Sequence, residues 1–288
     1  MKMKKWLYRA SLPAAIFVLA ACSSTGEPTD GTVDTSDLTL EEVYNKAIER
    51  QTELKSVTAN VTADQNILFD VDGETMEVLS KTEMKMDTQM EPLAFFADGT
   101  VAMESNGESM DMPLQMYMTA TDGFFVHDGA ANTWMKLPAE MTDEMLAQIG
   151  TQGDASQQLK QLKEYISDFT FEQSDTEYIL TLNADGEKFN ELVLANAGSA
   201  LEGLSMDEQQ MLETMSFEDA VYTLTIDKET FDTTKVDMDF VMKMEMEGQV
   251  STIDTTSSSV FSNFNAVEPI SVPKEVIEQA VDAQEIGN

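Results

Sequence analysis

Residues 57–71 read VTANVTADQNILFDV, and apolar side chains alternate with polar ones through most of this stretch. A period of two residues places successive side chains on opposite faces of a β-strand, so we expect one face to be buried and the other to face water. The stretch ends at Asp72-Gly73, a pair typical of tight hairpin turns. Similar pairs follow at Asp98-Gly99, Asn106-Gly107, Asp122-Gly123, Asp185-Gly186 and Glu247-Gly248. Strands joined by repeated turns of this kind predict an antiparallel meander.

An amphipathic helix precedes the first of these strands. Residues 39–42 read TLEE, a capping box in which the side chains of Thr39 and Glu42 accept hydrogen bonds from each other's backbone N–H groups. Helical spacing of apolar residues and helix-start signals then predict these helices: 40–54, 138–149, 154–166, 187–196 and a last helix that begins at Pro273. The sequence therefore predicts an α+β protein with one globular domain over residues 38–288.

The first residues of the chain are typical of a targeting signal and not of the folded domain. A basic start is followed by an apolar run over residues 12–21, which suits a secretory signal and is too short to span a bilayer. The run ends Leu19-Ala20-Ala21-Cys22, which resembles the lipobox of bacterial lipoproteins. Because Cys22 is the only cysteine, we expect residues 1–21 to be a signal peptide and Cys22 to be a lipid anchor, although an ordinary signal with an incidental cysteine is the alternative.

Residues 22–37 are polar, are interrupted by Gly26, Pro28 and Gly31, and have almost nothing to bury. A flexible chain of this length reaches about 20 Å on average. We therefore expect a flexible tether that lifts the folded domain off the outer, extracytoplasmic surface of the cell membrane.

Composition excludes several classes of function. The 288 residues include 53 acidic and 17 basic side chains, a net charge of −36, which argues against nucleic acid as a partner. The single histidine, His127, stands next to Asp128, but no nucleophile motif accompanies the pair, and a lone cysteine cannot form a disulfide within the chain. We find no phosphate-binding loop and no set of metal ligands. The sequence thus predicts a protein that is not an enzyme and that has no cofactor and no metal.

Methionine is unusually frequent, with 21 residues, and it follows the strand period. In three segments methionines alternate with charged or polar side chains, so each segment would carry its thioethers on one face. If these strands are neighbours, one face of the sheet is covered with thioethers, and we take it as the candidate apolar binding face. Its residues are Met84, Met86, Met110, Met112, Met116, Met118, Met238, Phe240, Met242 and Met244.

Three interpretations of this face remain open. It can be a core that packs on the helices, because methionine fills irregular gaps. It can be a cavity for a flexible apolar guest, such as a lipid acyl chain or the acylated end of another lipoprotein. It can hold Cu(I), because thioethers select this ion. Residues two apart on a strand are separated by about 6.6 Å, and no histidine or free cysteine joins them, so copper is the weakest of the three.

The aromatic segments in the middle of the chain and the segment before the last helix add to the features described above. Residues 264–276 read FNAVEPISVPKEV, and the aromatic segments GFFVHD (123–128) and TWMKLP (133–138) lie in the middle of the chain. With the lipobox, the polar spacer, the helix and the long meander, they resemble the LolA/LppX/LprG-like lipoprotein superfamily, and within it uncharacterised lipoproteins of Bacillus-type Gram-positive bacteria, over residues 38–285. The resemblance implies a strongly curved antiparallel sheet, a half-open barrel, wrapped around several helices, with an apolar concave face that carries lipoproteins or glycolipids in some members. It supplies no catalytic residue.

We therefore expect a membrane-anchored, extracytoplasmic lipoprotein that binds or carries an apolar ligand on the methionine-rich face. Its partners would be the membrane, through Cys22, and a lipid or lipoprotein ligand. The alternative is a structural or regulatory lipoprotein of the cell envelope that binds another protein and has a filled core. A cavity below the usual size of ligand sites would favour this alternative.

Overall fold

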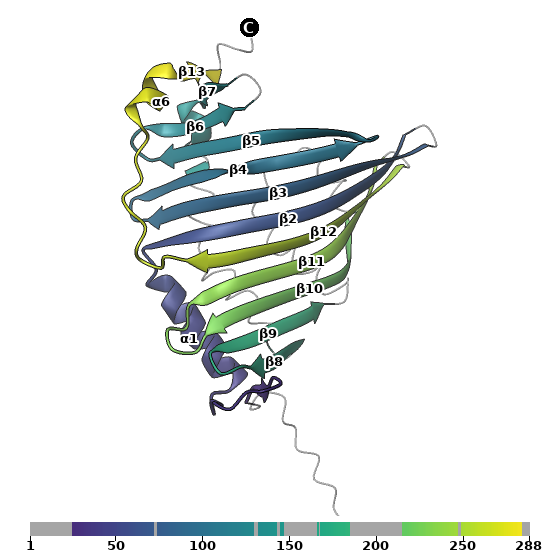
Figure 1. Ribbon diagram of the computed structural model, residues 1–288, viewed down its shortest axis with the longest axis vertical. Helices are drawn as coiled ribbons and strands as arrows, with labels where there is room; N and C mark the ends of the chain where they lie inside the picture. The colour runs from purple at the N-terminus through teal and green to yellow at the C-terminus, as the bar shows by residue number, and fades with distance from the viewer. Residues whose placement is uncertain are drawn as a thin grey trace, which may run out of the picture.

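In the computed structural model the strands form one long, curved, open sheet (Figure 1). The structure describes residues 25–71, 74–129, 132–142, 145, 146, 166, 168–184, 215–246 and 249–283. The strands are β1 (Glu27–Pro28), β2 (Ser56–Val71), β3 (Glu74–Met90), β4 (Leu93–Ser105), β5 (Glu108–Thr119), β6 (Gly123–Asp128), β7 (Thr133–Lys136), β8 (Phe169–Gln173), β9 (Glu177–Ala184), β10 (Ser216–Asp227), β11 (Thr233–Met246), β12 (Gln249–Ser262) and β13 (Val281–Asp282). The helices whose bounds fall within the described residues are α1 (Leu40–Thr52) and α6 (Lys274–Gln279).

Two antiparallel runs of strands, β2 to β7 and β8 to β12, are joined side by side where β12 pairs with β2. The complete order is β1-β8-β9-β10-β11-β12-β2-β3-β4-β5-β6-β7-β13. The two outermost strands, β1 and β13, are only two residues long and pair in parallel with β8 and β7. Because β1 and β13 lie at opposite edges and do not pair with each other, the sheet stays open and does not close into a barrel.

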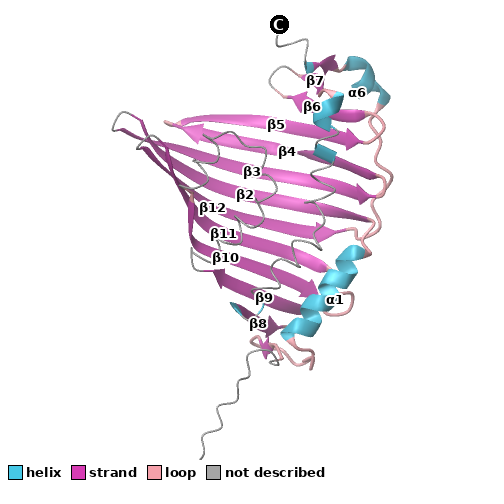
Figure 2. Ribbon diagram, turned by 180° about the vertical axis from the view of Figure 1, so that it is seen from behind, coloured by secondary structure: helices cyan, strands magenta, loops and turns pink. Residues whose placement is uncertain are grey.

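The expected α+β arrangement, with a sheet wrapped around several helices, needs correction. The strongly curved, largely antiparallel sheet is confirmed, but the described residues are mostly strand. Within them α1 and α6 lie at opposite ends of the sheet, so no layer of helices lies between two walls of strands (Figure 2). Of the helix expected over 138–149, residues 139–142, 145 and 146 are helical, and residues 143, 144 and 147–149 lie outside the described residues. The helices expected over 154–166 and 187–196 lie outside the described residues, except for Ile166.

The turn signals had mixed outcomes. Asn106-Gly107 and Asp122-Gly123 are at the β4–β5 and β5–β6 hairpins, as predicted, and the backbone has a positive φ at Asn106, Gly107 and Gly123. Asp98-Gly99 is not a turn: it lies inside β4. A Cβ atom on Gly99 would lie 2.7 Å from Met84 Cα in β3, so this glycine allows two strands to approach each other. The remaining pairs lie outside the described residues.

Helix α1 begins at the predicted capping box. Glu42 accepts a hydrogen bond from the Thr39 backbone N–H at 2.9 Å, and Thr39 Oγ1 accepts one from the Glu42 N–H at 3.3 Å. The Thr39 backbone N–H and the Thr39 hydroxyl both donate to the Glu42 carboxylate, and these two bonds hold its pKa below the ordinary value. One face of the helix is buried against the apolar side chains of β8, β9 and β10 and forms the larger core of the protein. This core contains Leu40, Val43, Tyr44, Ala47, Phe169, Phe171, Tyr178, Leu180, Leu182, Leu224 and Ile226.

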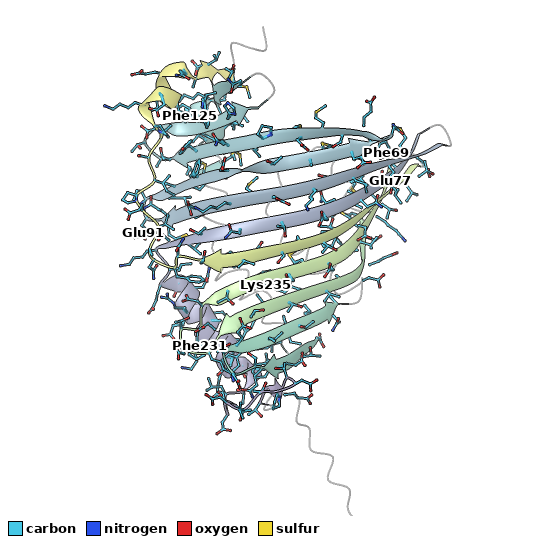
Figure 3. All side chains as sticks on the ribbon, in the orientation of Figure 1. Phe69, Glu77, Glu91, Phe125, Phe231 and Lys235 are labelled. Carbon is cyan, nitrogen blue, oxygen red and sulfur yellow. The ribbon has the colours of Figure 1, made fainter. Side chains whose placement is uncertain are left out.

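A second, smaller core lies at the other end of the sheet. Val272 and Val276, the latter in α6, pack on Phe125 of β6, and Tyr117 and Trp134 lie beside them. Phe125 is labelled in Figure 3 at the end of the sheet next to α6. The two cores use opposite faces of the sheet, because the ladder that contains Phe125 alternates with the ladder on which α1 packs.

The described part of the segment expected to be a flexible tether, residues 25–37, is bound to the sheet at several positions. β1 pairs with β8, and the side chain of Gln173, which is only 1% exposed, is hydrogen-bonded to this segment. Its Nε2 donates to Gly26 O at 2.7 Å, and its Oε1 accepts from Ser36 N at 2.8 Å. We call residues 25–36 the docked segment. The expectation of a flexible tether is therefore wrong for these residues, because backbone hydrogen bonds hold a stretch that has little apolar surface.

A second group on the sheet holds the same segment. The Asp175 carboxylate accepts hydrogen bonds from the backbone N–H groups of Asp34, at 2.9 Å, and Val33, at 2.7 Å. These two bonds lower the pKa of Asp175. Lys228 adds a further bond from its Nζ to Asp34 O at 2.9 Å.

Replacing Gln173 by Ala is expected to release the docked segment. Loss of its buried hydrogen bonds costs about 1–3 kcal/mol, so amide hydrogen exchange over residues 25–36 should become about tenfold faster or more. Exchange in β9 should not change. Glu172→Ala is the matched control, because Glu172 is the exposed neighbour on the other face of β8. Equal exchange in the two variants would show that Gln173 does not hold the segment.

Candidate functional site

Strand register places all ten residues of the candidate apolar face on one side of the sheet. Side chains directly opposite each other in neighbouring strands point to the same face. Met86 lies opposite Ala97, which lies opposite Met116. On the other half of the sheet, Met238 lies opposite Ser257, which lies opposite Ala63 and leads back to β3. We call this side the Met face: it carries Met84, Met86, Met110, Met112, Met116, Met118, Met238, Phe240, Met242 and Met244.

Helix α1 covers one end of the Met face, because the β8–β10 residues of the larger core lie on the same ladders. Exposure changes along the face. Met118 is fully buried, most of the other methionines are half-buried, and Met110 is 63% exposed. The face is therefore neither a uniformly filled core nor a solvent-exposed surface.

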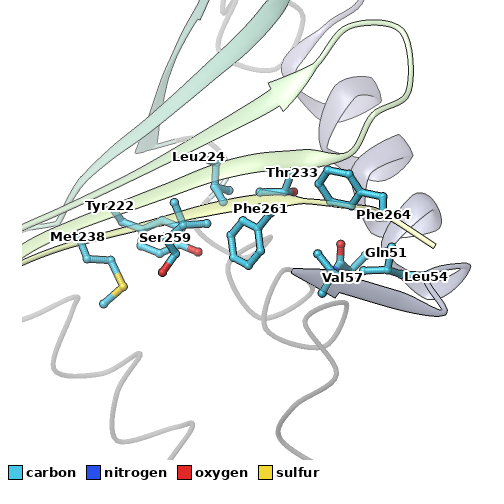
Figure 4. Close-up of a pocket in the computed structure, with 11 residues that line it drawn as sticks. Gln51, Leu54, Val57, Tyr222, Leu224, Thr233, Met238, Ser259, Phe261 and Phe264 are labelled. Carbon is cyan, nitrogen blue, oxygen red and sulfur yellow. The ribbon is translucent and has the colours of Figure 1, made fainter. Parts of the chain in front are cut away.

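A pocket of about 280 Å³ lies on the Met face beside the C-terminal end of α1 (Figure 4). Its walls come from the end of α1, the start of β2, the strands β10, β11 and β12, and the turn after β12. The lining residues are Gln51, Leu54, Val57, Tyr222, Leu224, Thr233, Val236, Met238, Ser259, Phe261 and Phe264. Of the ten predicted residues only Met238 lines it, so the methionine pattern predicts the face but not the pocket.

The pocket lies where β12 carries a small side chain between larger ones. Ser259 lies opposite Val236 of β11 and Val61 of β2. A serine leaves space between the larger residues on either side of it. The run TTSSS at 255–259 was the signal in the sequence that could have located this space.

Tyrosines bring polar atoms into this apolar region. Burial raises the pKa of Tyr222 to about 12. Burial also raises the pKa of Tyr44 in α1, and the nearby Tyr222 contributes to that shift. Both phenols therefore stay neutral at physiological pH.

Next to the pocket, Arg50 and Asp232 form an ion pair with each other. Arg50 Nε lies 2.7 Å from Asp232 Oδ1 and its second contact, from Nη2 to Oδ2, is 3.4 Å long. The pair joins the end of α1 to the turn between β10 and β11. Its two charges compensate each other and are not available to the pocket.

The other residues singled out from the sequence are placed as follows. Cys22 lies outside the described residues. His127 is half-buried on the opposite, polar face, and its ring lies 5.1 Å from that of Trp134. In the part of the chain that the structure describes, no three His, Cys, Asp or Glu side chains are grouped so as to hold a metal ion. Among the same residues, no helix has the length and hydrophobicity needed to cross a bilayer.

Comparisons with known proteins give a family and little else. A crystal structure of a DUF1329 family protein from Desulfovibrio piger is similar at 10% identity, over 80% of this chain and 95% of that one, with a TM-score of 0.20. A beta-barrel-like protein of the DUF1849 domain from Brucella abortus is similar at 6% identity, over 72% and 98%, also with a TM-score of 0.20. Scores this low support no argument about fold or function.

No protein with a curated function matches this chain. These results do not confirm the resemblance to LolA-like lipoproteins. The model of DUF6612, described as a family of unknown function, matches residues 39–281, and the chain therefore belongs to this family.

Proposed function

We propose that the protein is an extracytoplasmic lipoprotein, held at the membrane by Cys22, that binds an apolar ligand such as a lipid acyl chain on its Met face and catalyses no reaction. The observation that carries this proposal is the gathering of flexible thioethers on one face, with an apolar pocket where that face meets α1. Methionine adapts to guests of variable shape, and ligand pockets are mostly apolar with a few polar groups.

The pocket size favours a second candidate function. At about 280 Å³ the pocket lies just below the usual range of about 300–1,000 Å³ for small-molecule sites. A structural or regulatory lipoprotein that binds another protein would need no larger space. The two proposals differ in one observable: only the first requires a lipid to occupy the protein.

Binding is tested on the full-length chain carrying Cys22→Ser, so that its own lipid cannot enter the pocket. Lipids that co-purify are identified by mass spectrometry, and the uncharged dye Nile red is titrated as a probe. We expect Met238→Gln to weaken dye binding about tenfold, because it places an amide on the apolar pocket wall at a cost of about 1–3 kcal/mol.

Met141→Gln is the matched control, because Met141 is exposed and lies outside the sheet. It should leave dye binding unchanged. Repeated purifications without lipid, together with dye binding that is absent or insensitive to Met238→Gln, would contradict ligand binding and favour the second candidate.

A further inference from the structure

We infer that the pocket beside α1 takes the uncharged polar end of an amphiphile, an alcohol, ester or amide on a hydrocarbon chain, and rejects an ionised acid with the same chain. This inference rests on the proposed function and narrows the class of its ligand.

The first argument is the absence of a counter-charge. None of the described residues that line the pocket is charged. Arg50 precedes Gln51 in α1, but its guanidinium is bound to Asp232 at 2.7 Å. Among the described residues no cation is placed to compensate a carboxylate or phosphate in the pocket, and removing such an anion from water without compensation is costly. The net charge of −36 makes an anion still less favourable.

The second argument is a set of neutral hydroxyl groups. Tyr222, Thr233 and Ser259 line the pocket, and within the described part of the chain their side chains form no hydrogen bond. Figure 4 shows Tyr222 and Ser259 next to Met238, so polar and apolar contacts are available side by side. A hydroxyl both donates and accepts, and can therefore pair with a neutral alcohol, ester or amide. The three residues are half-buried, and a neutral ligand that covers their hydroxyl groups can replace the hydrogen bonds to water that those groups lose.

The environment of Tyr222 also favours a neutral ligand over an ionised acid. Its pKa is raised by burial, which means that a negative charge at this position is disfavoured relative to water. An ionised acid placed beside Tyr222 would meet the same penalty. A neutral group would not.

The experiment compares two ligands with the same hydrocarbon chain, glycerol monolaurate and laurate, as competitors of Nile red on the full-length Cys22→Ser chain. At a slightly alkaline pH laurate is ionised. We expect the monolaurate to displace the dye at a concentration about tenfold lower or more, which corresponds to about 1.4 kcal/mol. This comparison needs no further variant.

Tyr222→Phe tests the hydroxyl itself. We expect it to weaken monolaurate binding about threefold to tenfold, the effect of one hydrogen bond, and to leave laurate binding unchanged. Tyr117→Phe, on the polar face, is the matched control and should change neither ligand.

The outcomes separate the two proposals. Equal displacement by laurate and monolaurate, or an unchanged monolaurate affinity in Tyr222→Phe, overturns the neutral-ligand inference and leaves ligand binding standing. Failure of the dye and of both lipids to bind removes the proposed function and this inference together.

Discussion

Replacing Leu180 by Ala is expected to lower the free energy of unfolding by about 2–5 kcal/mol. Leu180 is fully buried in β9, in the core on which α1 packs. The substitution removes apolar contacts and leaves a cavity that the surrounding strands can fill only partly, because they are held by hydrogen bonds on both sides. Urea unfolding followed by circular dichroism measures the change.

Leu79→Ala is the matched control, since Leu79 lies on the polar face of β3 and is 42% exposed. It should change the free energy of unfolding by no more than about 0.5 kcal/mol. If the two substitutions destabilise the protein equally, the contact of α1 with β8–β10 is not the main core.

The second large effect is expected at the ion pair beside the pocket. Arg50→Ala leaves the Asp232 carboxylate, whose side chain is 8% exposed, without its partner. Removing one member of a fully buried pair costs about 3–5 kcal/mol. Because the Arg50 side chain is 24% exposed, we expect a smaller loss, about 2–4 kcal/mol, in urea unfolding.

Two further variants separate charge burial from other effects. Arg50→Leu combined with Asp232→Leu should recover most of the lost stability, because no unpaired charge remains. Lys243→Ala breaks the exposed pair with Glu218, at 2.7 Å, and should cost less than about 1 kcal/mol. A double variant as unstable as Arg50→Ala would show that the unpaired carboxylate is not the cause.

Much of the sheet could be predicted from local patterns. The alternation over residues 57–71 predicts β2 because the side-chain period of a strand is visible in the sequence alone. The capping box at Thr39 and Glu42 likewise locates the start of α1. The turn predicted at Asp98-Gly99 was wrong because a glycine in a strand interior and a glycine in a turn cannot be distinguished in the sequence. Only the approach of β3 to β4 distinguishes them.

The sequence predicts the Met face of the sheet, but it does not predict the pocket beside α1. Methionine alternation identifies the face within each strand, and neighbouring strands in register bring the three segments to one side. The space beside α1 depends on which residues are opposite in different strands, such as Ser259 and Val236. Register also shifts in β10 between Glu218 and Val221. Such pairings depend on the whole sheet, so no single segment encodes them.

The docked segment has a consequence for how the protein stands at the cell surface. If Cys22 carries the lipid, only residues 22–24 separate it from Thr25, which is bridged to Thr39 beside the start of α1. Three residues span at most about 10 Å. The β8 corner of the sheet, to which the docked segment is bound, would then stay close to the membrane surface.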